Sequence, residues 1–292
     1  MNKVLVLTDF SKNAKKAATT AIDVADKMNA DILLFNAYTA FPFLPTGEFV
    51  AWPPEYYMAF KEESSAKIKK EKNRLSNLIA NKSVLKRKIN ITYLTAEGTV
   101  AEHLHSLIND REVCLIIMGG REKTAGSFLF GSDIHDVIKK ASCPLLIVNS
   151  KMPDITLNNV VFATDLDPKD LKTVSYLLSQ SKVLHFHLHV CHVSQPPVFL
   201  PDFNEEDAIT HFMSQLSKLN YENLTYKGLK GDNIAKELDK YSKKIEADMF
   251  VLVHKKHSIF WRTLNQSPSK TLIRHQKYPI LIIPENWKTV AN

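Results

Sequence analysis

The chain contains an internal repeat, and this repeat restricts its fold more than any other feature of the sequence. The segment VLVLTDFS at residues 4–11 is echoed by VVFATDLD at residues 160–167, which begins 156 residues further on. Two later segments recur in the same order: VCLIIMGG (113–120) as MFVLVHKK (249–256), and CPLLIVN (143–149) as YPILIIP (278–284). A repeat of this length predicts two copies of one domain in tandem.

Each copy alternates short apolar runs with segments of helical periodicity. In the first copy the apolar runs are VLVL (4–7), ILLF (32–35), INITYL (89–94), VCLIIM (113–118) and PLLIV (144–148). Such near-continuous hydrophobicity is typical of parallel strands that helices cover on both faces. After the first run, apolar residues recur with helical spacing from 14 to 28, and Ser11 is the expected N-cap. The sequence therefore predicts an α/β fold with two tandem, doubly wound, five-stranded parallel-sheet domains.

The two domains are expected to occupy residues 1–150 and 158–286. The separation between matching segments shortens from 156 to 135 along the chain, so the first copy has about twenty additional residues. We place them in an insert at 39–56 that is rich in proline and aromatic residues. The insert is expected to be a loop packed on its own domain. The alternative is a lid or a partner surface, because exposed aromatic residues usually mark contacts.

Composition and charge exclude several classes of protein. The formal net charge of +7 arises mostly from lysines, which alternate with glutamates in KEESSAKIKKEKNRL (61–75) and are typical of a solvated helix face. The sequence has no basic stripe with interleaved aromatic residues, the pattern that would indicate nucleic-acid binding. The three cysteines argue against a disulfide framework and for a reducing compartment. No run reaches the ~18 apolar residues of a membrane span, and the first residues do not form a signal peptide. We therefore expect a cytoplasmic protein without nucleic-acid or membrane partners.

The candidate binding residues follow the strands of the first copy. In open α/β sheets, ligands bind beyond the carboxyl ends of the strands, at the point where the strand order reverses. Thr8 and Asp9 end the first strand, and Met118 and Gly119 end the fourth. The loop MGGREKTAGSFLFGSD (118–133) follows, and its glycines can adopt positive φ and expose backbone N–H groups. Its closing Gly-Ser pair opens a helix whose N-terminus favours an anion. Alternatively, the glycines only form a turn and the serine only caps the helix.

The whole chain resembles a tandem member of the universal stress protein family, whose domains are adenine-nucleotide-binding-like α/β folds. The resemblance rests on VLVLTDFS, IIMGG, the run GSDIHDVIKKASCPLLIV (131–148) and their weaker copies, and it covers nearly everything except the insert. Family members that bind ATP carry Gly-x2-Gly, then nine residues, then Gly-Ser or Gly-Thr. Here Gly119 matches the first glycine and Gly131-Ser132 the closing pair, but Glu122 stands at the second glycine and the intervening segment is one residue short.

The resemblance implies a set of nucleotide contacts in the first domain. It places Asp9 and Ala37 at the ribose or base, Met118 at the base, and Gly119, Gly131 and Ser132 at the phosphates. Thr8 lies beside Asp9, and Arg121 and Lys123 supply compensating positive charge. Glu122 and Asp133 lie near the phosphate path and disfavour an anion there. The expected cofactor is ATP or a related adenine nucleotide, in the first domain only.

The second copy has lost more of the motif. His254 and His257 replace both opening glycines, and Gln266-Ser267 replaces the closing pair, while Asp165 is retained. Side chains at the glycine positions restrict φ and fill the space of a phosphate. The loop remains basic through His254, Lys255, Lys256, His257 and Arg262, so a generic anion could visit it, although a solvated loop is the favoured interpretation.

Metal-binding and catalytic patterns are weak. HFHLHVCHV (185–193) places His185, His187 and His189 on one face of a strand, a spacing that can bind zinc, but the sequence assigns no further ligand. We therefore favour structural histidines and no metal. The sequence has no G-x-S-x-G, H-E-x-x-H or G-x-x-x-x-G-K-[ST] motif. We expect no enzyme, and any ATP hydrolysis would be slow and incidental.

These observations predict a non-catalytic stress-response protein that binds an adenine nucleotide in its first domain. The alternatives are a ligand-free scaffold in which both nucleotide cradles have decayed, and a module that binds a small anion or metabolite in a remodelled pocket. By resemblance, the last strands of the two domains, at 144–149 and 279–284, are expected to pair antiparallel about a pseudo-two-fold axis within one chain. A homodimer or another protein partner stays open.

Overall fold

The structure is a computed structural model of the 292-residue chain. It describes residues 2–39, 54–83, 85–120, 133–154, 156–195, 204–255, 278–285 and 287. The chain divides into two compact units, Met1–Ser150 and Lys151–Asn292, and each unit is described by itself. Within the described residues, no helix has the length and apolar character that a membrane crossing needs.

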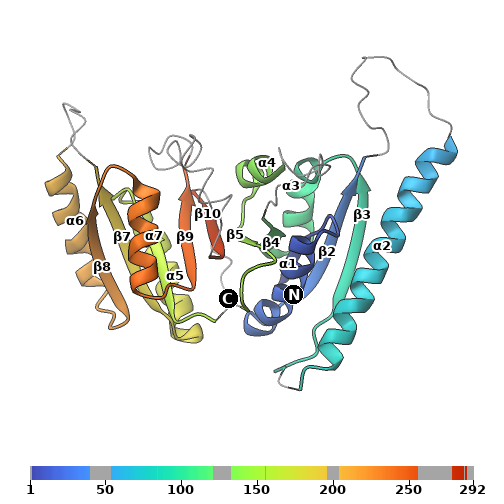
Figure 1. The fold of residues 1–292 in the computed structure, drawn as a ribbon, viewed down its shortest axis with the longest axis horizontal. Coiled ribbons are helices and arrows are strands. Elements are labelled where there is room, and N and C mark those ends of the chain that lie inside the picture. The colour runs from blue at the N-terminus through green and yellow to red at the C-terminus, as the bar shows by residue number, and fades with distance from the viewer. Residues whose placement is uncertain are drawn as a thin grey trace, which may run out of the picture. The chain divides into compact units, whose positions relative to one another are not determined.

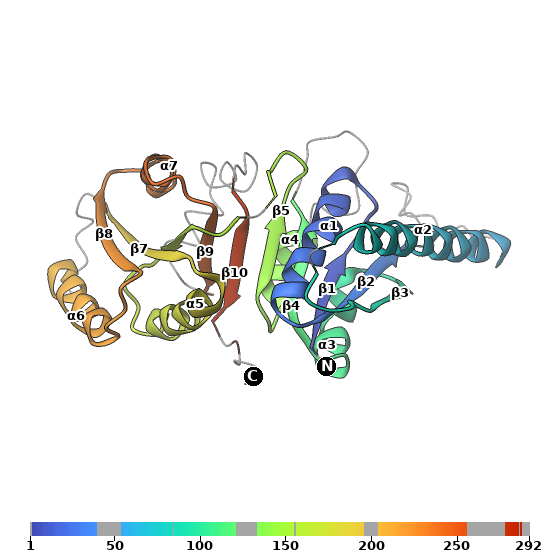
Figure 2. The same ribbon diagram turned by 90° about the horizontal axis from the view of Figure 1, so that it is seen from below.

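The first unit is a doubly wound parallel sheet with the strand order β3-β2-β1-β4-β5 (Figure 1). Its strands are β1 (Lys3–Leu7), β2 (Asp31–Tyr38), β3 (Ile91–Glu97), β4 (Val113–Gly119) and β5 (Leu145–Val148). Its helices are α1 (Lys12–Lys27), α2 (Pro54–Ala80), α3 (Val100–Asp110) and α4 (Asp133–Lys140). Helix α1 packs against α2, and α3 packs against α4. Figure 2 shows α2 and α3 on opposite faces of the sheet.

The second unit repeats this arrangement with the strand order β10-β9-β6-β7-β8, and its described strand pairs are parallel. Its strands are β6 (Asn159–Ala163), β7 (His187–Ser194), β8 (Leu224–Lys230), β9 (Met249–His254) and β10 (Ile280–Pro284). Its helices are α5 (Asp170–Leu184), α6 (Glu205–Lys218) and α7 (Ile234–Lys244). Helices α5 and α6 lie on one face of the sheet and α7 on the other (Figure 2).

The predicted fold class is confirmed, and the apolar patterns explain it. The central strand β1 is buried from Val4 to Leu7, with 0–1% exposure, because helices cover both faces of the sheet. Helix α1 begins where expected, since the Ser11 hydroxyl accepts a hydrogen bond from the N–H of Ala14 at 3.2 Å. The expected pairing of 144–149 with 279–284 concerns two units that are described separately, so it stays a prediction.

The repeat extends to the backbone conformation of individual turns. Phe10 and Leu166, which lie 156 residues apart, follow the first strand of each unit and have φ values of 64° and 66°. Asn29 and His185, at the same separation, follow α1 and α5 with φ values of 52° and 58°. Residues other than glycine rarely adopt this left-handed conformation. Its recurrence at matching positions therefore indicates that the two units share their turn geometry as well as their strand order.

Two expectations need correction. His185 is the left-handed C-cap of α5 and lies outside β7, so the prediction that three histidines line one strand face is wrong for this residue. The additional length of the first unit is also not only a loop. Helix α2 has 27 residues whereas its counterpart α6 has 14, and α2 begins at Pro54, inside the expected insert. Residues 40–53 of the insert lie outside the described residues.

Candidate functional site

The candidate site lies at the carboxyl ends of β1, β2 and β4. Leu7, the last residue of β1, is paired with Phe35 of β2 and with Met118 of β4. The strand order reverses between β1 and β4, because β2 and β3 lie on one side of β1 whereas β4 and β5 lie on the other. This is the position at which open parallel sheets bind ligands. The sheet thus brings together the predicted residues that follow these strands.

The turn between β1 and α1 fixes Asp9 at this edge. The Thr8 hydroxyl accepts a hydrogen bond from the N–H of Phe10 at 3.0 Å, and the Asp9 carboxylate accepts one from the N–H of Ser11 at 3.0 Å. These short-range bonds are characteristic of tight turns built by Thr and Asp side chains. Asp9 is half-buried, and its carboxylate is held by the turn at the mouth of the site.

A buried polar chain holds Thr8 in place. The N–H of Thr8 donates to Phe35 O at 2.9 Å, and the Thr8 carbonyl accepts a hydrogen bond from Asn36 Nδ2 at 2.7 Å. The Ser64 hydroxyl on α2 then donates to Asn36 Oδ1 at 2.7 Å, and both side chains are 5% exposed. The sequence analysis missed Asn36, although a polar residue within the apolar run DILLFNAY is a visible signal.

Gly119 is required by close packing and not by its backbone conformation. Its φ lies outside the left-handed region, but an added Cβ would lie 2.6 Å from the carbonyl carbon of Asn13 and 2.7 Å from the N–H nitrogen of Ala14. The expectation that positive φ explains this glycine is therefore wrong. The N-terminus of α1 approaches β4 so closely that only glycine fits.

The backbone of Gly120 is held from both sides. Its N–H donates to Val148 O at 2.5 Å, and its carbonyl accepts a hydrogen bond from Asn13 Nδ2 at 2.5 Å. Asn13, 4% exposed, also accepts a hydrogen bond at Oδ1 from the N–H of Ser150 at 2.7 Å. The expectation that this glycine exposes its N–H is wrong, because β5 already uses the donor. Asn13 was missed by the sequence analysis, and it joins α1 to the ends of β4 and β5.

The other predicted contact residues differ in how they are placed. Ala37 on β2 is half-buried and paired with Ala96 of β3, next to the end of the strand. Met118 is 1% exposed, so its side chain belongs to the core and is not presented at the edge of the sheet. The remaining predicted phosphate-binding residues, together with Glu122, lie outside the described residues: Arg121, Lys123, Gly131 and Ser132.

The second unit repeats the turn but changes the side chains around it. The Thr164 hydroxyl accepts a hydrogen bond from the N–H of Leu166 at 3.0 Å, as Thr8 does from Phe10. His192 takes the place of Asn36, since its Nδ1 lies 3.1 Å from Thr164 O and its Nε2 lies 2.9 Å from a carboxylate oxygen of Glu205. The same architectural role is therefore performed by different chemistry.

A lysine occupies the centre of the site's counterpart in the second unit. Lys255 directly follows β9, as Gly120 follows β4. Its ammonium contacts the Asp165 carboxylate, lies 2.8 Å from Asp170 Oδ1 and lies 3.4 Å from Asp167 Oδ2. The Lys255 side chain is 8% exposed and that of Asp170 is 2% exposed. Neither the favoured interpretation, a solvated loop, nor the alternative, a loop open to an anion, holds for Lys255, because this ammonium is buried among carboxylates of its own domain.

Burial and charge determine the protonation of this cluster. Burial raises the pKa of Asp170 to about 6, even though Lys255 and the Thr164 hydroxyl, which donates to Asp170 at 2.7 Å, both act to lower the pKa. Burial alone would lower the pKa of Lys255, but Asp170 and Asp165 outweigh it and the pKa is raised. Three carboxylates surround one ammonium, so the cluster carries an excess of negative charge and would repel a phosphate.

His187 and His189, the two histidines of the predicted group that lie on β7, belong to a hydrogen-bonded group. The rings of His187 and His189 lie 4.6 Å apart. His189 Nδ1 lies 3.0 Å from the Tyr241 hydroxyl, and its Nε2 lies 3.2 Å from Asn159 Oδ1. Burial, assisted by the neighbouring His187, lowers the pKa of His189 to about 4. Among the described residues, no group of three or more His, Cys, Asp or Glu side chains could hold a metal ion.

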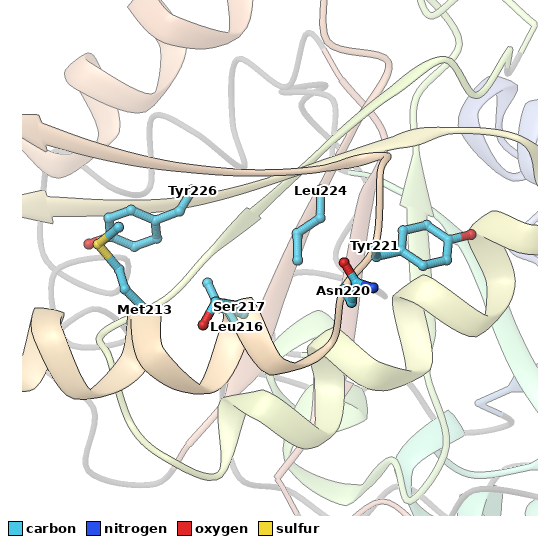
Figure 3. A pocket seen from close by; sticks show the side chains of 7 residues that line it. All are labelled: Met213, Leu216, Ser217, Asn220, Tyr221, Leu224 and Tyr226. Carbon is cyan, nitrogen blue, oxygen red and sulfur yellow. The ribbon is translucent and has the colours of Figure 1, made fainter.

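A separate hollow of about 300 Å³ lies between α6 and β8, towards the amino end of the strand (Figure 3). It is lined by Met213, Leu216, Ser217, Asn220, Tyr221, Leu224 and Tyr226. Figure 3 shows Met213 beside the ring of Tyr226. None of the seven lining residues carries a charge, and the hollow lies near the amino end of β8, away from the carboxyl ends of the strands of its own unit.

Comparison with known proteins identifies relatives of both units. A model described as the universal stress protein family matches residues 1–149 and 156–284. A universal stress protein of Methanocaldococcus jannaschii is 28% identical over 147 residues, which cover 50% of this chain and 81% of the relative. A universal stress protein of Thermus aquaticus is 29% identical over 146 residues, which cover 50% of this chain and 96% of the relative.

Solved structures resemble the chain over nearly its whole length. A universal stress protein from Archaeoglobus fulgidus has a TM-score of 0.67 at 16% identity, and the match covers 97% of this chain and 96% of the A. fulgidus chain. A protein of unknown function from Pseudomonas aeruginosa has a TM-score of 0.56 at 12% identity, covering 97% of this chain and 92% of its own. At these identities the likeness shows the fold.

Proposed function

Because the chain belongs to the universal stress protein family, whose members act in stress responses, we propose that it binds ATP or a related adenine nucleotide in its first domain only. The proposed role is binding and not catalysis. Asp9 is one carboxylate at the edge of the sheet, and general acid–base chemistry usually needs a second positioned group. The nucleotide would act as a signal whose presence or absence is read by a partner.

The contrast between the two domains at one place in the fold carries this proposal. Strand β4 ends in Gly119 and is followed by Gly120, so neither residue adds a side chain at the end of this strand. Strand β9 ends in His254 and is followed by Lys255, whose side chain lies among three carboxylates at the strand ends of the second domain. An adenine nucleotide carries negative phosphates, so the first domain is the compatible one on both space and charge.

The residues at the strand ends have distinct proposed tasks. Asp9, fixed by the N–H of Ser11, would accept a hydrogen bond from a ribose hydroxyl. Ala37 would leave room for the base beside β2. The predicted phosphate contacts of Arg121, Lys123, Gly131 and Ser132 are retained as part of the proposal, although these residues lie outside the described ones.

The experiment compares two matched substitutions by isothermal titration calorimetry with ATP. Asp9→Ala removes the carboxylate from the first domain, and Asp165→Ala removes its counterpart, 156 residues later, from the second. We expect one site per chain, an affinity at least about ten-fold weaker in Asp9→Ala, and an unchanged affinity in Asp165→Ala. Equal losses in both variants, or a loss in Asp165→Ala alone, would exclude the first domain as the specific site.

The second candidate function is a ligand-free scaffold. The engagement of the Gly120 N–H by Val148 O favours it, because a donor that phosphate-binding loops commonly offer is already used within the fold. Mass spectrometry of the native protein, purified without added nucleotide, separates the two functions together with the titration. Absence of co-purified nucleotide and absence of binding heat would establish the scaffold.

The proposal also includes association of the two domains within one chain. Among the described residues of each unit, the last strand, β5 or β10, pairs with one strand of that unit, so its other edge is unpaired within the unit. An unpaired edge of this kind is a liability that proteins usually cover. Pairing of 144–149 with 279–284 would cover both edges at once. A crystal structure of the full chain in which these segments lie apart would refute this part of the proposal.

A further inference from the structure

The geometry around Lys255 points to a second role for the site's counterpart in the second domain. We propose that Lys255 acts as a built-in substitute for a bound ligand, which holds the ends of β6 and β9 and the start of α5 together without any external molecule. This role does not depend on nucleotide binding by the first domain. The second domain would then keep its strand ends joined whether or not a ligand is present.

The contacts of the ammonium join three separate parts of the domain. Lys255 follows β9, Asp165 and Asp167 belong to the turn after β6, and Asp170 is the first residue of α5. All three carboxylates have an oxygen within 3.4 Å of the same nitrogen. Because the Lys255 and Asp170 side chains are only 8% and 2% exposed, water cannot take over the role of either partner.

The neighbouring charges already have partners of their own. Lys169 Nζ lies 2.7 Å from Glu285 Oε1, and His192 Nε2 lies 2.9 Å from Glu205 Oε1. Lys172, in the first turn of α5, donates from Nζ to the carbonyl of Trp287 at 2.7 Å. Lys255 is therefore the ammonium that balances Asp170 within the described part of the domain.

In the first domain the corresponding elements, the start of α1 and the end of β4, meet through a different pair of residues. Near the start of α1, Asn13 donates from its neutral amide to the carbonyl of Gly120. Near the start of α5, Asp170 instead faces the ammonium of Lys255, the residue that directly follows β9. Without the lysine, the carboxylate would be buried without a counter-charge. Without the carboxylate, the lysine would carry the same kind of free-energy cost. The first domain joins the same elements through a neutral bond, and the second joins them through an ion pair.

The decisive variant is Lys255→Met in the full chain, which removes the charge but keeps a side chain of similar length. The midpoint temperature of thermal unfolding of the second domain is expected to fall by roughly 10–20 °C at pH 8, because Asp170 is left buried without a counter-charge. The fall should be smaller at pH 5, where protonation of Asp170 removes the unpaired charge. Hydrogen exchange should be at least about ten-fold faster in β6 and α5, with the first domain as the internal control.

Two further variants separate charge from shape. Lys255→Met/Asp170→Asn combines the methionine with the amide that the first domain uses, and it should recover most of the lost thermal stability. Lys243→Met removes an exposed pair with Asp239, with 54% and 31% exposed side chains, and should shift the midpoint by no more than about 2 °C. Equal losses in the single and double variants, including failure of both to fold, would overturn the proposal. So would a Lys255→Met protein that unfolds as the wild type does at both pH values.

Discussion

Substitution of Gly119 by alanine tests the packing that shapes the candidate site. The new Cβ would lie 2.6 Å from the carbonyl carbon of Asn13 and 2.7 Å from the nitrogen of Ala14, whereas ordinary carbon contacts begin near 3.4 Å. Both atoms belong to the backbone, so the first turn of α1 must move away from β4 by close to 1 Å. Insertions of this kind into packed interiors cost typically about 1–3 kcal/mol.

The same movement would pull Asn13 away from the carbonyl of Gly120, which lies 2.5 Å from its amide nitrogen. Loss of this buried hydrogen bond adds about 1–3 kcal/mol, so the total expected destabilisation of the first domain is roughly 2–6 kcal/mol. Urea unfolding followed by hydrogen exchange in α1 measures the effect and assigns it to a domain. ATP affinity should fall as well, because α1 and Asp9 move together.

Gly228→Ala is the matched control for this substitution. Gly228 lies on the edge strand β8, and an added Cβ would come no closer than 4.0 Å to the Tyr226 ring. Its effect should be neutral or slightly stabilising, within about 1 kcal/mol. If Gly119→Ala unfolds at the same urea concentration as Gly228→Ala, the close approach of α1 to β4 cannot be the reason for glycine at position 119.

Three other predictions follow from the same structure. Asn13→Asp should destabilise the first domain by about 3 kcal/mol at pH 7 in urea unfolding, and less at pH 5, because it buries a carboxylate in place of a neutral amide. The pKa of His189 is about 4 in the folded protein and 6.5 ordinarily. Its contribution to stability is therefore complete above pH 6.5 and is lost as the pH falls towards 4. His189→Gln should flatten this pH dependence of the urea midpoint. Glu122→Gly should tighten ATP binding roughly ten-fold in calorimetry and Gly131→Val should weaken it, and no change in either variant would mean that the loop is purely structural.

The fold was predictable because its determinants are local or periodic. Buried strands such as β1 read as continuous apolar runs, and α1 has both a stripe of small apolar residues and the capping hydroxyl of Ser11. The repeat added the tandem arrangement, since segments with matching patterns that recur in the same order are expected to form matching elements. The helical extension of α2 into the insert was not predicted, because prolines and aromatic residues at 53–57 are typical of a loop.

The side-chain contacts that define the site were not predictable in the same way. Asn13 meets Gly120 across 107 residues of sequence, and Lys255 meets Asp165 across 90. The sequence around Lys255 predicts a basic loop. Its contact with carboxylates at the end of another strand depends on the pairing of strands in the sheet, which the local sequence does not indicate. Alignment of the two copies does not reveal this pair, because the offset of 156 places Asn13 opposite Lys169 and not opposite Asp170.

Native mass spectrometry of the 33.2 kDa chain in the presence of excess ATP tests the central claim most directly. The two domains share a fold and a β–α turn, but the residues at their strand ends differ. The first domain has two glycines there, and the second has a buried lysine with three carboxylates. The account predicts that the spectrum saturates at one nucleotide per chain, and that the adduct disappears in Asp9→Ala but persists in Asp165→Ala. Saturation at two nucleotides per chain, or a chain that takes up none, would contradict it.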